Sequence, residues 1–122
     1  MSSQLDPFLA AEQEQKARDR QYLIRGKIVA ICESILSQEI GVIAGSRRLS
    51  SLGLELYNGR DEEFIMFDAV TSETDHLPVD SERANWSTEA LQRKDQEIGE
   101  VESFYQDDVF AACRKLLEKF AR

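Results

Sequence analysis

Apolar residues recur at helical intervals along most of the chain. Near its start, four isoleucines follow one another at steps of four, three and four residues: Ile24, Ile28, Ile31 and Ile35. This spacing is typical of an amphipathic helix. Asp6 directly precedes Pro7, as an N-cap precedes a first helical residue that needs no N–H. The pattern predicts a helix from about Pro7 to about Ser37, and the highly polar residues 1–20 are expected to project from the domain or to fray.

A second helix is predicted from about Ile40 to Leu56. Its apolar and small positions alternate at steps of three and four residues: Val42, Gly45, Leu49, Leu52 and Leu56. Asn58 and Gly59 supply the stop signal. Glycine inside a helix costs about 1 kcal/mol relative to alanine. The glycines of this helix therefore indicate that other elements pack closely against it.

The segment that follows Asp61 has a less decisive pattern. In EEFIMFDAV, Phe64 and Phe67 lie on one side of a helix, but FIMF is also compatible with a short strand. A lone strand would leave its backbone groups without partners, and the sequence offers no second strand. We therefore expect a short third helix capped by Asp61.

The last 35 residues carry the clearest helical signal. Ser87 is a predicted N-cap, Glu89 lies in the first turn where the helix dipole favours acids, and Trp86 is positioned to pack on Leu91. An apolar stripe continues for about 30 residues: Leu91, Ile98, Val101, Tyr105, Val109, Ala112, Leu116 and Phe120, beside a second row of Phe104, Cys113 and Leu117. The predicted fold is all-α, a small antiparallel helical bundle with long first and last helices.

Length and composition agree with one helical domain over residues 1–122. The chain has 42% hydrophobic and 31% charged residues, which suits a packed globule. No apolar run approaches the roughly 20 residues of a membrane span, so we expect a cytoplasmic protein that has no membrane partner. Cys32 and Cys113 fall on apolar helix faces, where reduced cysteine behaves as a small hydrophobe.

The net charge of −8 is concentrated in the middle of the chain. Residues 1–54 carry seven bases and six acids, and residues 83–122 carry seven bases and eight acids. Between Glu55 and Glu82 there are nine acids and one base, Arg60. A surface of this sign repels phosphate, so nucleic-acid binding is not expected as the main activity.

The acidic segment is interpreted as a docking face for a basic protein partner, in which acids steer the encounter and aromatic side chains anchor the contact. The residues assigned to this face are Tyr57, Glu62, Glu63, Asp68, Glu73, Asp75, His76, Asp80, Glu82 and Trp86. An acidic surface that serves only solubility is the alternative.

A chemical site around His76 is a second hypothesis. With Asp75 and Glu73 beside it, the imidazole has neighbours suited to proton transfer or metal binding. A zinc site usually needs several His or Cys at ordered spacing, and this chain has one His. No catalytic, metal or cofactor site is therefore assigned. The segment is better explained as a connector in which Leu77 and Val79 turn inward and the acids face solvent.

Arg47 and Arg48 also have two interpretations. Guanidinium groups bind phosphate in a bidentate manner, but the net charge favours neutralisation of the acidic segment from a neighbouring helix. The surrounding AGSRRLSSLG lacks the ending of a phosphate-binding loop.

Three strings, SRRLSSL, SETDHLP and WSTEALQRKDQEI, resemble the signature of a family of small uncharacterised bacterial cytoplasmic proteins, over about Ile40 to Phe120. The resemblance implies a bacterial setting and no assigned activity. As a compact, acidic, helical protein with exposed aromatic residues, the predicted protein is also similar to bacterial immunity proteins that neutralise cationic nuclease toxins. The two long helices also favour a homodimer as a structural alternative.

Overall fold

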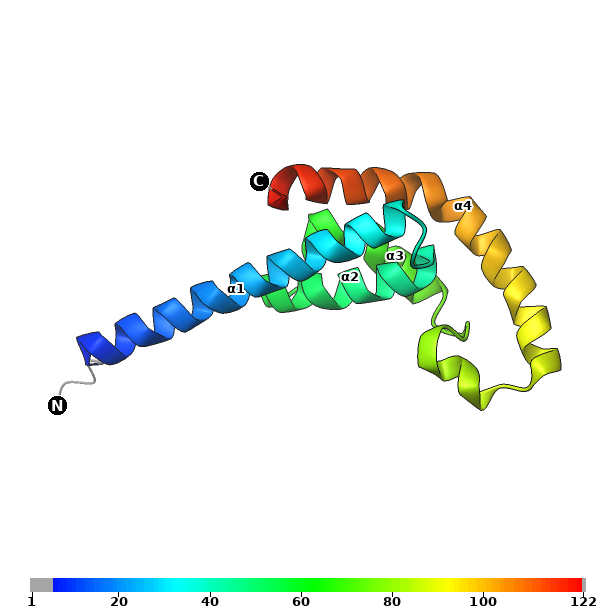
Figure 1. Ribbon diagram of the computed structural model, residues 1–122, viewed down its shortest axis with the longest axis horizontal. Helices are drawn as coiled ribbons and strands as arrows, with labels where there is room; N and C mark the ends of the chain where they lie inside the picture. Colours follow the sequence, from blue (N-terminus) through cyan, green and yellow to red (C-terminus); the bar gives the residue numbers. More distant parts are fainter. Residues whose placement is uncertain (1–5, 122) are drawn as a thin grey trace.

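The computed structural model describes residues 6–121, and in that range all regular structure is helical. The elements, in order, are α1 (Pro7–Leu36), α2 (Val42–Tyr57), the 3₁₀ helix η1 (Glu62–Phe64), α3 (Ile65–Glu73), the 3₁₀ helix η2 (Asp80–Asn85) and α4 (Thr88–Phe120). Helix α1 packs against α2 and α4, while α2 packs against α3 (Figure 1). The predicted all-α bundle with long first and last helices is confirmed.

Helices α1, α2 and α4 begin or end at the capping residues that the sequence predicts. The Asp6 carboxylate accepts the backbone N–H of Phe8 at 2.9 Å, and Ser87 Oγ accepts that of Ala90 at 3.2 Å. Each bond satisfies an N–H that has no partner within its helix. Helix α2 ends at Asn58, whose φ of 52° is left-handed, a conformation that asparagine tolerates well.

The core lies where α1, α2, α3 and the second half of α4 meet. Ile24, Ile28 and Ile35 of α1, the Phe64 and Phe67 rings, and Val109 and Leu116 of α4 are buried there, and Ile31 is partly buried against them. Gly53 faces the Phe64 ring so closely that a Cβ would lie 2.5 Å from Cγ, and a Cβ on Gly45 would overlap Ile35. The close packing predicted from the glycines of α2 is confirmed.

The first half of α1 extends beyond the rest of the molecule (Figure 1). From Pro7 to Leu23 every residue is exposed except Ala10, which is half-buried. Over these residues α1 covers no part of the core. Among residues 6–121, no helix has both the length and the apolar character needed to cross a membrane.

The first half of α4 also leaves the bundle, which its apolar pattern does not predict (Figure 1). There α4 is joined to the connector by polar contacts: Arg83 binds Asp95 through two bonds of 2.6 and 3.0 Å, and the Tyr105 hydroxyl donates to Glu73. Phe104 is 75% exposed, so its assignment to an apolar row beside Cys113 was wrong. Helix η2 was not predicted either.

Candidate functional site

Most of the acids assigned to the docking face have partners inside the molecule. Glu63 pairs with Lys119 and accepts the Tyr57 hydroxyl at 2.7 Å, while Asp68 accepts the Ser50 hydroxyl. The acids of the connector are exposed, as expected, but Glu73 and Asp80, and also Glu82 of η2, each bind a side chain of another helix. Internal pairs of this kind reduce the charge that a partner would meet.

The two arginines of α2 supply two of these partners. Arg47 bonds to Glu82 at 2.9 Å and also donates to the backbone carbonyls of Thr74 and Leu77, and Arg48 bonds to Asp80 at 3.2 Å. Arg47 therefore fastens both the α3–η2 connector and η2 itself onto α2. The expected neutralisation of the acidic segment by these arginines is confirmed.

His76 lies at the surface, with half of its side chain exposed, and its Nε2 is 2.9 Å from Glu97 Oε1. It lines neither of the two cavities described below. Asp75 is exposed and forms no bond with another described residue, while Glu73 is engaged by Tyr105. Within residues 6–121, no three His, Cys, Asp or Glu side chains are grouped as metal ligands would be. The hypothesis of a chemical site at His76 gains no support.

The assigned residues are spread over the molecule instead of forming one group. Glu63 and Tyr57 meet Lys119 near the end of α4, whereas His76 meets Glu97 in its first half. Those positions on α4 are separated by roughly 30 Å of helix. Trp86, which is 37% exposed, directly precedes the N-cap of α4. The structure does not gather the ten residues into one patch around the indole.

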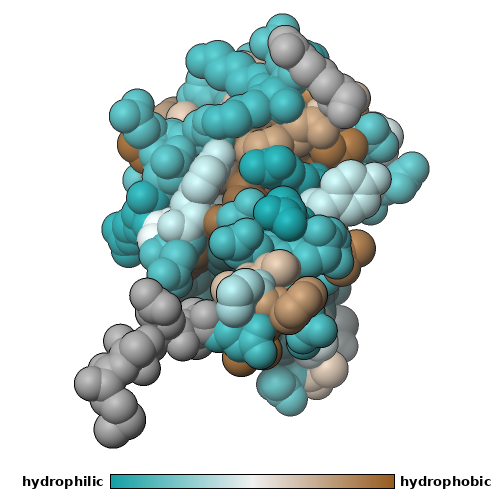
Figure 2. Space-filling view, turned by 90° about the vertical axis from the view of Figure 1, so that its left-hand side faces the viewer, coloured by the Kyte–Doolittle hydropathy of each residue, from teal (hydrophilic) through white to brown (hydrophobic). Residues whose placement is uncertain are grey.

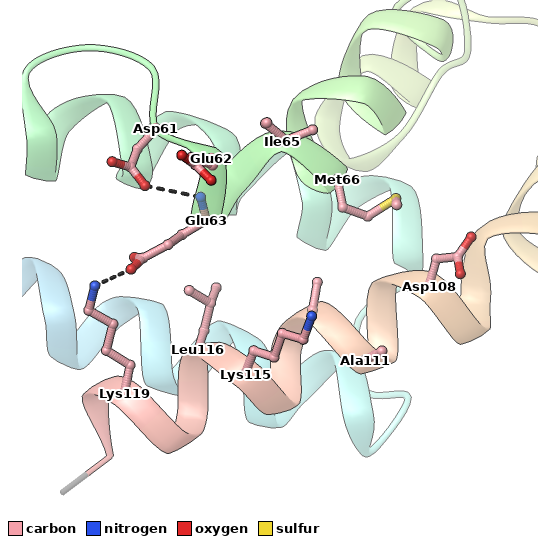
Figure 3. Close-up of a pocket in the computed structure, with 11 residues that line it drawn as sticks. Asp61, Glu62, Glu63, Ile65, Met66, Asp108, Ala111, Lys115, Leu116 and Lys119 are labelled. Atoms are coloured by element: carbon pink, nitrogen blue, oxygen red, sulfur yellow. Dashed lines mark hydrogen bonds and ion pairs between the residues drawn. The ribbon is translucent and has the colours of Figure 1, made fainter.

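A groove between η1–α3 and the second half of α4 does collect acids and apolar side chains (Figure 3). Its volume is about 920 Å³, and the residues that line it are Asp61, Glu62, Glu63, Ile65, Met66, Asp108, Ala111, Ala112, Lys115, Leu116 and Lys119. Figure 3 shows the Glu63–Lys119 pair at one end of the groove and Asp108 at the other. Four acids and two bases give its lining a formal charge of −2.

The acids of the groove differ in how free they are. Asp61 caps η1 by accepting the Glu63 N–H at 3.0 Å, and Glu63 is held by Lys119. Burial raises the pKa of the Glu63 carboxyl, but the hydrogen bonds from Lys119 and Tyr57 lower it by more than burial raises it. The pKa of Glu63 therefore lies below its ordinary value. Glu62 and Asp108 are exposed and bond to no other described side chain.

Two exposed apolar side chains flank this groove. Ile65, at the start of α3, is 60% exposed. Phe104 lies one helical turn before Asp108 and is therefore on the same side of α4. Its ring contacts Tyr105 edge-on, with centroids 4.9 Å apart, and remains 75% exposed. Together, Ile65 and Phe104 place apolar surface beside two unpaired carboxylates.

The sequence identified only part of this groove. Glu62 and Glu63 were among the assigned residues, but Phe104 and Asp108 lie outside the acidic segment Glu55–Glu82. The available signal was an aromatic residue and an acid four positions apart in a predicted helix, which a count of charge along the chain does not register.

Cys32 of α1 and Cys113 of α4 are both free and buried, as expected. They face each other closely enough to interact, and this interaction together with burial raises the pKa of the Cys32 thiol. They form part of the contact between α1 and α4.

Comparison with known proteins gives a family and no activity. None of the curated proteins matches the chain significantly. The solved structures likewise contain no significant match. A family model does match, over residues 2–116, and its description is protein of unknown function (DUF2489). Because the match covers nearly the whole sequence, the chain belongs to the DUF2489 family.

Proposed function

We propose that this protein is a non-catalytic binding module whose groove between α3 and α4 receives a basic amphipathic helix of a protein partner. The observation that carries the proposal is the combination of exposed Ile65 and Phe104 with the unpaired carboxylates of Glu62 and Asp108 around an apolar floor. Amphipathic helices commonly bind in this way, with apolar side chains in the groove and charges at its rim.

The dimensions of the groove suit a short helical segment. Along α4 its lining extends from Asp108 to Lys119, a distance of about 16 Å at 1.5 Å per residue. A partner helix of three turns spans the same length. Ala111 and Ala112 present short side chains to the groove, which leave room for larger apolar residues of the partner.

The negative charge of the groove favours a positively charged partner. The formal charge of the lining is −2, within a chain of net charge −8, so a basic helix gains both at encounter and in the bound state. Occlusion of a cationic toxin, the role of an immunity-type inhibitor, is one form that such binding takes. The groove replaces the predicted Glu55–Trp86 face as the proposed binding site. The proposed class of partner, a basic protein, is the same.

Site-specific photo-crosslinking tests this proposal. A photoreactive amino acid is placed at Ile65, which lines the groove, or at Phe104, one turn beyond its Asp108 end. Leu54 serves as a control position, because it is 44% exposed on α2 and does not line the groove. We expect the same basic protein to be captured from positions 65 and 104 and not from position 54. Capture should fall as the salt concentration rises.

Charge reversal provides the matched control. Glu62→Lys with Asp108→Lys should abolish the crosslink, whereas Glu39→Lys with Asp75→Lys, which changes net charge equally at exposed positions outside the groove, should preserve it. If both double variants lose capture to the same degree, the interaction depends on overall charge and the groove is not the site.

A further inference from the structure

The projecting half of α1 exposes apolar side chains that cover nothing in its own chain. Phe8 is 83% and Leu9 45% exposed, and Tyr22 and Leu23 are exposed at the other end of the same segment. Most helical stability in proteins comes from packing of an apolar face, and isolated helices of this length are marginal in water. A helix that extends over several turns without a core contact therefore invites a partner along its side.

Charge is divided along α1 in a way that identifies such a partner. Residues 6–15 contain three acids and no base: Asp6, Glu12 and Glu14. Residues 16–27 contain five bases and one acid: Lys16, Arg18, Arg20, Arg25 and Lys27, with Asp19. An antiparallel copy that sets residues 6–15 of one helix opposite residues 24–33 of the other brings Glu12 opposite Lys27 and Glu14 opposite Arg25. The helix is therefore complementary to itself.

A second cavity lies where the end of such a helix would arrive. It has a volume of about 470 Å³ between α1 and α2, with an apolar floor of Ile31, Ala44 and Leu52. Its rim includes Lys27 together with Arg47, Arg48 and Asp80, and the two arginines are paired with Glu82 and Asp80. Lys27 is exposed and has no ion pair with any residue in the range 6–121. Viewed from the end at which α1 projects, the surface is mostly hydrophilic with smaller hydrophobic patches (Figure 2).

We propose that two copies of this chain form a symmetric dimer in which the α1 helices pair antiparallel, and the Phe8–Leu9 end of each helix occupies the α1–α2 cavity of the other copy. The apolar end of the helix matches the apolar floor of the cavity, and its Glu12 matches the unpaired Lys27 of the rim. In a two-fold interface every contact occurs twice, so each favourable pair counts double.

One register satisfies both matches together. When Phe8 of one protomer lies opposite Ile31 of its partner, Glu12 falls opposite Lys27. This register uses the exposed arm over its whole length. It leaves the groove between α3 and α4 free, because none of the groove residues belongs to α1, so the dimer and the proposed partner helix occupy different surfaces.

Sedimentation equilibrium of the full chain tests the dimer. The wild-type protein should have twice the monomer mass of 13.9 kDa. Glu12→Lys or Lys27→Glu alone should weaken the dimer about tenfold, since exposed ion pairs contribute up to about 1 kcal/mol and two are reversed. The double variant Glu12→Lys with Lys27→Glu should restore most of that loss, as a double-mutant cycle requires of residues in contact. Phe8→Ser should weaken the dimer further.

A charge reversal outside α1 serves as the control for these variants. Lys115→Glu reverses an exposed base outside α1 and should leave the dimer unchanged. A monomeric wild-type protein at millimolar concentration would overturn the proposal. So would a dimer that neither single charge reversal weakens, or a double variant that is weaker than both single variants. Circular dichroism of each variant separates loss of pairing from loss of fold, since all of these positions are exposed.

Discussion

Replacing Gly53 with alanine should destabilise the protein, although alanine is the better helix former. In a solvent-exposed helix this change stabilises by about 0.5–1 kcal/mol. At Gly53, however, the new Cβ would lie 2.5, 2.7 and 2.8 Å from Cγ, Cδ1 and Cδ2 of Phe64. These are atoms of a rigid ring that is only 2% exposed and stands beside the rings of Tyr57 and Phe67, so the ring has little room to give.

Overpacking of a core costs typically about 1–3 kcal/mol, which exceeds the gain in helix propensity. We expect a net loss of about 1–2 kcal/mol in the free energy of unfolding, measured by urea denaturation, with a fall in Tm of roughly 5 °C. Phe64 belongs to η1, which forms one wall of the groove, so the variant should also weaken partner capture.

Gly99→Ala is the matched control for this substitution. Gly99 also lies within a helix, but no atom lies within 4 Å of the Cβ that alanine would add. The same chemical change should therefore stabilise α4 by about 0.5–1 kcal/mol. A Gly53→Ala protein as stable as Gly99→Ala would refute the argument that Phe64 packs directly on the α2 backbone.

Three further predictions address the N-terminal cap of α2, the core, and the contact between η2 and the first half of α4. Glu102→Ala should lower the Tm by the equivalent of about 1 kcal/mol, because the Glu102 carboxylate accepts the Ile43 N–H at 2.9 Å at the start of α2. Phe67→Ala should cost about 3–5 kcal/mol in urea denaturation, since Phe67 is fully buried. The bond from Arg83 lowers the pKa of Asp95 below its ordinary value of 3.8. A lowered pKa stabilises the fold above that value, and the contribution is lost as the pH falls through the folded-state pKa. Arg83→Gln should therefore make stability less dependent on pH in urea denaturation series below about pH 5.

The helices themselves were predictable because their signals are local. Asp6 and Ser87 cap helices by bonds that span two and three residues. The spacing of the isoleucines in α1 by itself predicts which face of that helix packs against the core. The glycines of α2 also indicated close packing, although the sequence could not say that Ile35 and Phe64 would fill the space.

The bending away of α4 and the surface charge were not predictable from local patterns. Ile98 and Val101 continue the apolar stripe and are partly buried against the core, while polar bonds to Glu73, His76 and Arg83 join this part of α4 to the connector and to η2. Glu63 is neutralised by Lys119, which lies 56 residues away in the chain. Such pairings depend on how helices are placed in space, so a charge count along the sequence overestimated the acidic face and missed Asp108.

Amide chemical-shift mapping tests the central claim, that the groove between α3 and α4 binds a basic amphipathic helix. The uniformly ¹⁵N-labelled protein is titrated with a three-turn helical peptide that has lysines on one face and leucines on the other. We expect saturable shifts concentrated in residues 61–66 and 108–119, and we expect Glu62→Lys with Asp108→Lys to abolish them. Shifts spread evenly over exposed acids such as Asp75 and Glu39, with the groove unchanged, would contradict it.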